Sequence, residues 1–316
     1  DDLDRFAVSE GGLRFVVDTA YERVRGAGVR IDAVFAVDAQ DRTLDHFTQA
    51  PPERLIAVPV VPPRLFKLAR EKMINSLVGP LFEWFDQSLT RPVARLKSGG
   101  SVTTFAFDLA RRMGAGPIVL VGADFAHRDG RRHVPGTAYE RLASAALDRF
   151  ASIEDMTRRQ LEEVAVVENG LRTENNLVQY ARWLAWEIRE TRSEVLRLAD
   201  FGLMREVPVI EAKRLAAVLD APRPELRWPA ARREDPRRLI ECMRAERIAL
   251  DEVLKGDARA LTALSGFYDP IVRPAAVASR RGALTPEALD ELCDRLRHAR
   301  AVLDEVLGAA NMSRTE

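Results

Sequence analysis

Cysteine and long apolar runs are both scarce in this sequence. Its 316 residues include two cysteines, Cys242 and Cys293, which lie far apart in segments with helical periodicity. Such sparse cysteine fits a reducing compartment better than a disulfide framework. No stretch approaches the roughly 20 apolar residues that span a bilayer, and the acidic start at residues 1–4 lacks the positive region of a signal peptide. We therefore expect a cytoplasmic protein with no membrane partner.

An excess of charge of one sign is also absent. Lys and Arg number 48, Asp and Glu number 48, and the formal net charge is +0 at pH 7. The sequence therefore lacks the broad positive field that attracts nucleic acid, and we expect no nucleic-acid partner. No spacing of Cys and His matches a structural zinc site, so we expect no bound metal. The 47% apolar and 30% charged content is that of an ordinary globular protein.

Short β-branched runs alternate with helical periodicity through the first two thirds of the chain. This pattern predicts an α/β fold with a Rossmann-like, mostly parallel sheet and flanking helices. The near-continuous apolar character of the runs predicts strands buried on both faces. We expect strands at residues 15–17, 33–37, 55–58, 118–121, 164–167 and 195–198, and helices at 19–26, 102–113 and 176–190.

The pattern changes after about Glu211, where strand-like runs give way to helical stretches. Four prolines between residues 222 and 236 predict a connector, and helices are expected at 237–255, 258–267 and 286–307. We therefore predict a Rossmann-like catalytic domain at 1–212 and a helical C-terminal domain at 213–316. These last helices could pack on the first domain, form a homo-oligomer or dock a protein acceptor.

Polar residues follow three of the predicted strands. In open parallel sheets, ligands bind beyond the carboxyl ends of the strands, so we expect these residues to line a site. They are Asp18, Thr19, Asp38, Gln40, Gly122 and Asp124.

The strongest local motif is SGGSVTT at residues 98–104, a glycine pair followed directly by a predicted helix. Exposed amides and the helix dipole at such a position favour a phosphate or carboxylate. The motif lacks both the lysine-serine ending of a P-loop and the full dinucleotide glycine fingerprint. A tight strand-to-helix turn capped by Ser101 explains the same pattern equally well.

Two further loops carry candidate polar groups. His127, Asp129 and His133 follow the Asp124 strand end, where a histidine can act as a general base and a carboxylate can orient it; a polar surface loop is the alternative. Glu168 and Asn169 follow another apolar run and could face the same crevice, although Asn-Gly is equally a common turn.

Three segments together resemble a known family. SGGSVTTFAFDLARRMGAGPIVLVGADFAHRDGRRHV resembles the signature region of the motility accessory factor family, which also includes archaeal 6-hydroxymethylpterin pyrophosphokinases. FVVDTAYERVRGAGVRIDAVFAVDAQD is similar to that family's earlier strand-helix-strand unit, and VVENGLRTENNLVQYARWLAWEI is similar to its later strand, loop and helix. The order and spacing of all three, over roughly residues 14–210, make the resemblance much more specific than one glycine motif.

The resemblance implies a sheet related to that of bacterial sialyltransferases and a glycosyltransferase activity. Bacterial members are implicated in attaching nonulosonic acids to serines and threonines of flagellin, which implies a CMP-activated sugar donor, a protein acceptor such as flagellin and no required cofactor. By the same resemblance Gly99, Gly100 and Ser101 would hold the donor's phosphate or carboxylate, and Asp18, Asp38 and Asp124 would lie around the nucleotide or acceptor. We predict His133 and Asp124 as catalytic residues, with His133 as the base, and add the candidates from the other strand ends and loops to the binding residues. The binding set is Asp18, Thr19, Asp38, Gln40, Ser98, Gly99, Gly100, Ser101, Thr104, Gly122, Glu168 and Asn169.

Two other functions stay open, one because of the archaeal relatives with the same glycine loop and one because of a departure from the family pattern. Family members carry a first strand ending in a Gly-Pro-Ser-Leu-like loop, and this chain begins without it, so we expect one wall of the nucleotide pocket to be absent from this chain. ATP-dependent pyrophosphoryl transfer to a hydroxymethylpterin is the first alternative, with Mg²⁺ held by acids such as Asp38 and Asp124. A noncatalytic binding or assembly protein with the same fold is the second.

Overall fold

The computed structural model describes residues 2–128, 131, 133–145, 152, 165–230, 235–256 and 285–312. The predicted helix at 258–267 and the candidate Asp129 lie outside these residues.

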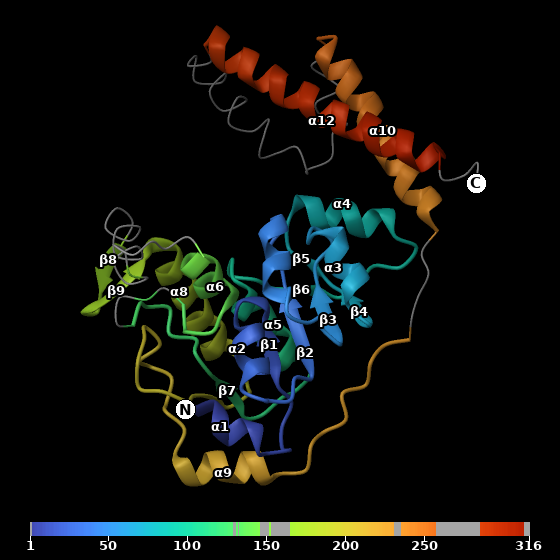
Figure 1. The fold of residues 1–316 in the computed structure, drawn as a ribbon. Coiled ribbons are helices and arrows are strands. Elements are labelled where there is room, and N and C mark those ends of the chain that lie inside the picture. Colours follow the sequence, from blue (N-terminus) through green and yellow to red (C-terminus); the bar gives the residue numbers. More distant parts are fainter. Residues whose placement is uncertain are drawn as a thin grey trace. The chain divides into compact units, whose positions relative to one another are not determined.

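A four-stranded parallel sheet is the centre of the first half of the chain (Figure 1). Its strands are β1 (Phe15–Val17), β2 (Ala33–Ala36), β3 (Arg54–Ala57) and β4 (Glu71–Ile74), in the order β1-β2-β3-β4. The two inner strands are buried on both faces, which is why they read as continuous apolar runs: Phe35, Leu55 and Ile56 are all 0% exposed. The edge strand β4 alternates between half-buried and exposed residues, and its polar alternation explains why no strand was predicted there.

A second parallel pair consists of β7 (Ile118–Leu120) and β10 (Val195–Arg197), with Ile118 opposite Val195. Three helices lie at the predicted positions: α2 (Tyr21–Gly26), α5 (Val102–Arg112) and α8 (Asn175–Glu190). Helix α5 packs on β1 and β2, where the rings of Phe105 and Phe35 lie 5.9 Å apart. The predicted α/β fold class is therefore confirmed.

The described part of the chain also contains a set of short elements. They are α1 (Asp2–Ala7), η1 (Asp18–Ala20), η2 (Asp41–Phe47), α3 (Pro63–Leu68), β5 (Ser76–Leu77), α4 (Pro80–Ser88), β6 (Arg95–Leu96), α6 (Ala138–Ala145) and α9 (Ala212–Asp220). Both α3 and α4 begin with proline, whose fixed φ and missing N–H suit the first helical position.

The prediction that the strand at 164–167 belongs to the parallel sheet is wrong. Strand β8 (Ala165–Glu168) pairs antiparallel with β9 (Leu171–Glu174) in a hairpin. The two residues between them, Asn169 and Gly170, have φ angles of 51° and 76°. A two-residue turn with positive φ at both positions matches the twist of a hairpin, and Asn-Gly is the sequence that favours it.

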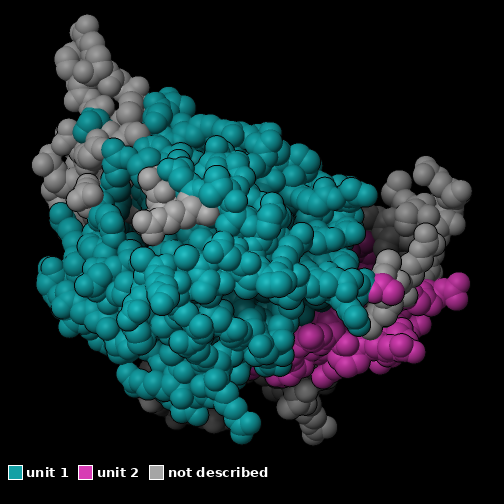
Figure 2. All heavy atoms as spheres, turned by 90° about the horizontal axis from the view of Figure 1, so that it is seen from below, with its two compact units in different colours: residues 1–75, 96–229 teal, residues 76–95, 230–316 magenta. Residues whose placement is uncertain are grey.

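The chain divides into two compact units, coloured separately in Figure 2. The first comprises residues 1–75 and 96–229, and the second comprises residues 76–95 and 230–316. This division follows spatial contacts, so the second unit takes in a segment from the first third of the chain. The predicted sequence boundary at residues 212 and 213 stays a prediction.

The second unit contains α4, α10 (Pro236–Leu254) and α12 (Pro286–Met312). The Asp235 side chain caps α10 by accepting from the Arg237 N–H at 2.9 Å. Leu250 and Leu296 are buried where α10 and α12 pack, and Arg300 bonds to Asp251 across the same contact. Among the helices that the structure describes, none combines the length and apolar character needed to cross a membrane.

Candidate functional site

Two carboxylates stand at the carboxyl edge of the four-stranded sheet, directly after β1 and β2. Asp18 opens η1 and is 4% exposed, and its Oδ1 accepts from the Thr19 N–H at 2.7 Å. Asp38 is exposed and its Oδ1 accepts from the Gln40 N–H at 3.0 Å. Because β1 and β2 are parallel neighbours, the structure brings all four predicted residues to one edge, with Asp18 buried behind the surface.

Asp18 is the most strongly perturbed acid at this edge. Burial raises the pKa of Asp18 to about 7, the nearby charge of Asp38 adds to the rise, and the Thr19 N–H opposes it. The carboxyl group therefore holds or releases its proton close to neutral pH, the range in which a general acid or base works best.

The glycine loop lies toward the same edge. Phe105 in the first turn of α5 contacts Phe35 near the carboxyl end of β2, so the start of α5 lies near the polar strand ends. Ser101 is the N-cap of α5 and forms a capping box with Thr104. The predicted helix start is therefore confirmed.

The amides of the loop donate to its own side chains. Thr104 Oγ1 accepts from the Gly99 N–H at 2.9 Å and from the Ser101 N–H at 3.4 Å, and Ser98 Oγ accepts from the Gly100 N–H at 3.2 Å. The loop thus has the capped turn that its sequence allowed. A phosphate-binding role for Ser98, Gly99, Gly100, Ser101 and Thr104 stays a prediction.

The two glycines are required by packing against α8. A Cβ atom at Gly99 would lie 2.5–2.7 Å from three ring atoms of Trp183. A Cβ atom at Gly100, whose φ is +96°, would lie 2.6 Å from the Tyr180 ring. Neither contact could be foreseen from the sequence, because about 80 residues separate the loop from α8.

Asp124 lies in a tightly turned loop after β7. Gly122 and Phe125 both have positive φ, 68° and 52°, and the Asp124 carbonyl accepts from the Leu203 N–H at 2.9 Å. Burial raises the pKa of Asp124 above its usual range, while Arg128 and Arg197 limit the rise. Arg128 Nη2 is 3.9 Å from Asp124 Oδ2, which adds a cation that was not among the predicted site residues.

The two histidines of the next loop lie in different surroundings. His127 is 6% exposed, and its Nε2 lies 3.3 Å from Glu174 Oε1. His127 is therefore an interior side chain, and the surface-loop alternative is wrong for it. His133 stacks on Tyr139 with ring centroids 4.1 Å apart, and its predicted role as the base stays a prediction.

Glu168 and Asn169 are not at the carboxyl end of a parallel strand. They lie at the turn of the β8–β9 hairpin, where Glu168 Oε1 pairs with Arg182 Nη2 at 2.9 Å. The expectation that they follow a strand of the parallel sheet is wrong, because the Asn-Gly turn reverses the chain at this point.

A polar cluster beside the Asp38 loop was missed. Arg141 Nη2 on α6 donates to Glu22 Oε1 at 3.2 Å, to the Asp45 carbonyl at 2.8 Å and to Thr48 Oγ1 at 2.8 Å. His46 is buried close by, and burial lowers its pKa while Glu22 and Asp45 oppose the change. No sequence signal could have found this cluster, because its members come from segments up to 119 residues apart.

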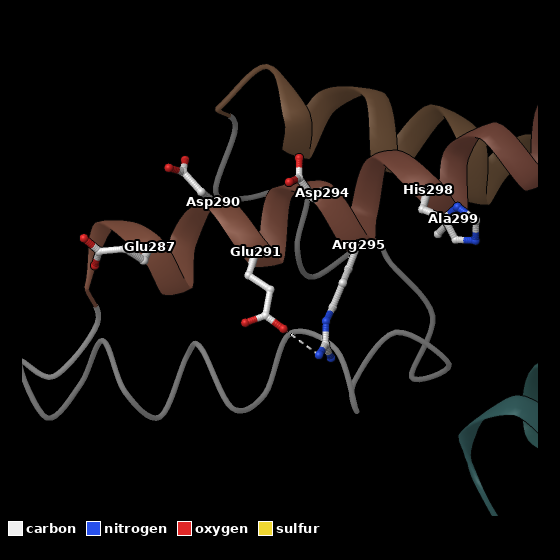
Figure 3. Close-up of a pocket in the computed structure, with 7 residues that line it drawn as sticks. All are labelled: Glu287, Asp290, Glu291, Asp294, Arg295, His298 and Ala299. Carbon is white, nitrogen blue, oxygen red and sulfur yellow. Dashed lines mark hydrogen bonds and ion pairs between the residues drawn. The ribbon is translucent and has the colours of Figure 1, made fainter.

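A surface depression on the second unit contains none of these residues. Figure 3 shows its lining along α12, with acidic side chains and the ion pair between Glu291 and Arg295 at 2.7 Å. Within the described part of the chain, His, Cys, Asp and Glu form no group of three or more that could hold a metal ion.

Comparisons with known proteins agree with part of the sequence resemblance. Residues 12–130 match the family model described as 6-hydroxymethylpterin diphosphokinase MptE-like. No curated protein sequence matches the chain. The solved MAf glycosyltransferase from Magnetospirillum magneticum AMB-1 is similar, with 16% sequence identity and a TM-score of 0.48, covering 93% of this chain and 48% of that one. This chain thus spans about half the length of that glycosyltransferase. From before β1 to the Asp124 loop, the chain is similar to the MptE-like family, and the resemblance inferred from the sequence is confirmed there.

Proposed function

We propose that this chain acts in transfer of a nonulosonic sugar from a CMP-activated donor to a serine or threonine hydroxyl of a protein such as flagellin. The reaction breaks the bond between the anomeric carbon and a phosphate oxygen of CMP and forms a bond to the acceptor oxygen. The acceptor proton passes to a base, and CMP leaves as an anion. The resemblance of the three sequence segments to motility accessory factors supports this choice of donor and acceptor.

The observation that carries the proposal is the raised pKa of the buried Asp18 carboxyl group. A carboxyl group with a pKa of about 7 exchanges protons at neutral pH, as acid-base chemistry on an acceptor hydroxyl requires. Asp18 therefore supports acid-base chemistry on a hydroxyl group at this edge of the sheet.

ATP-dependent pyrophosphoryl transfer to a hydroxymethylpterin is the second candidate. The match of residues 12–130 to a family model named for that activity favours it. In that reaction the exposed Asp38 and the partly buried Asp124 would hold Mg²⁺ against the nucleotide phosphates.

Melting temperatures in the presence of nucleotides separate these functions, since a ligand that binds the native state raises the melting temperature. We expect CMP to raise it without Mg²⁺, and Asp18→Asn to change the pH dependence of that shift near pH 7. Asp294→Asn, on the exposed face of α12, is the matched control and should bind CMP as the parent chain does. A Mg²⁺-dependent shift with ATP in place of CMP would support the pterin enzyme, and no shift with any nucleotide would support a noncatalytic protein.

A further inference from the structure

Helix α8, with the strand β9 that precedes it, contacts both loops of the candidate site. In β9, Thr173 Oγ1 donates to the Phe125 carbonyl at 2.7 Å, and the Arg172 carbonyl accepts from the His127 N–H at 2.8 Å. Glu174, the N-cap residue of α8, adds the contact with the His127 ring at 3.3 Å. These three contacts join β9 and the N-cap of α8 to the Asp124 loop.

Farther along, one face of α8 meets the glycine loop. Tyr180, Trp183 and Glu187 recur at helical spacing and therefore lie on one side of α8. In that order they meet Gly100, Gly99 and Lys97: the two rings contact the glycines, and Glu187 Oε1 pairs with Lys97 Nζ at 2.7 Å. Residues 97–100 and α8 therefore run in opposite directions along this contact, and each of the three α8 side chains contacts one residue of the other segment.

At the contact between Gly99 and Trp183, neither the ring nor the loop can move easily. The Trp183 atoms nearest a Cβ at this position are Cγ, Cδ2 and Cε3, which belong to the rigid ring and lie near its attachment to the backbone. On the other side, the Gly99 and Ser101 amides are both bonded to Thr104 Oγ1, so the loop cannot retreat without losing those bonds. A change at Gly99 must therefore displace the loop, α8 or both.

We propose that Trp183 is a positioning residue that sets the distance between the glycine loop and the Asp124 loop through α8. The proposal rests on the proposed function in one respect, namely that a ligand contacts both loops at once. A displaced α8 would then carry Phe125 and His127 with it and separate the two halves of the site. Trp183 acts through Gly99 and needs no contact with the ligand.

Gly99→Ala and Trp183→Ala, alone and combined, test this coupling without any ligand. Hydrogen exchange of the backbone amides at residues 122–127 and 203 is the readout, because these amides lie in or bond to the Asp124 loop. We expect at least tenfold faster exchange in Gly99→Ala and, in the double variant, exchange no faster than in Trp183→Ala alone, since removing the ring makes room for the added methyl group. Additive effects of the two changes, or unchanged exchange in Gly99→Ala, would overturn the proposal.

Two matched controls isolate the contact. Gln179→Ala shortens an exposed side chain on the same helix and should not rescue Gly99→Ala. Gly26→Ala adds a methyl group where no atom lies within 4 Å and should leave exchange in the Asp124 loop unchanged. If Gly99→Ala does not fold, Trp183→Ala alone should speed exchange at both loops, whereas Gln179→Ala should speed it at neither.

CMP affinity measured on the same variants addresses the dependence on function. We expect Gly99→Ala to weaken CMP binding at least tenfold and the double variant to bind CMP as tightly as Trp183→Ala alone does. Coupled exchange without CMP binding by the parent chain would leave the positioning role of Trp183 standing and reject the proposed function. CMP binding by the parent chain, together with additive effects of the two changes on exchange, would support the proposed function and reject the positioning role of Trp183.

Discussion

At the scale of single residues, Asp18 and His46 oppose each other in their effect on stability. Asp18 has a pKa of about 7 in the folded chain against a usual 3.8. Between these values the unfolded chain has released a proton that the folded chain keeps, so stability falls as pH rises from about 4 to 7. His46 has a lowered pKa in the folded chain, so the stability that this group contributes is lost as pH falls below 6.5, the usual pKa of histidine.

Replacing Asp18 by Asn isolates the acidic group. The Asn side chain keeps an oxygen that can accept from the Thr19 N–H and has no charge to bury. We expect the variant to be more stable than the parent at pH 8 by up to about 4 kcal/mol, the equivalent of a shift of roughly three pKa units, and nearly equal to it at pH 4. Urea denaturation at the two pH values measures this, and an equal difference at both would show that Asp18 is ionised when folded.

At the scale of elements, Arg141 joins α6 to α2 and to η2. The Glu22 side chain that it contacts is 4% exposed, and a buried carboxylate without its cation is strongly destabilising. The loops that follow β1 and β2 are thereby held together by a helix that comes about 100 residues later in the sequence. This contact stabilises the edge on which Asp18 and Asp38 lie.

We expect Arg141→Met to lower the free energy of unfolding by about 2 kcal/mol, because Glu22 keeps its burial and loses its guanidinium partner. Glu22→Gln in the same background should recover more than half of that loss. Arg214→Met breaks an ion pair whose partners are both about half exposed and should change stability by less than about 0.5 kcal/mol. Urea denaturation of these variants checks the prediction, and no recovery by Glu22→Gln would contradict it.

At the scale of the whole molecule, each compact unit has its own apolar core. Leu55 is 0% exposed in the parallel sheet of the first unit, and Leu250 is 0% exposed between α10 and α12 in the second. Two separate cores favour two unfolding transitions over one cooperative transition.

Calorimetry of two truncations tests this expectation. Leu→Ala at a fully buried site costs about 2–5 kcal/mol, so Leu250→Ala should lower the melting temperature of one transition and Leu55→Ala that of the other. Ala substitution of Leu289, which is 46% exposed on α12, should shift neither by a comparable amount. A single transition that both core variants lower equally would contradict the prediction.

The sequence by itself determined the elements whose signals are local. Apolar runs located β1, β2 and β3, and Ser101 before a periodic segment located the start of α5. The same logic brought Asp18 and Asp38 to one edge, because parallel neighbouring strands end together. These features depend on spacing within about 25 residues, which the sequence shows directly.

Tertiary structure decided what depends on distant segments. The β8–β9 hairpin is not among these features, because its Asn169-Gly170 turn is a local signal that the sequence already allowed as a common turn. Burial changed the pKa of Asp18, and Gly99 packs against Trp183, a contact that spacing, which left a ligand loop and a capped turn equally open, could not show. Burial and ring contacts arise from segments far apart in the sequence, and only folding brings them together.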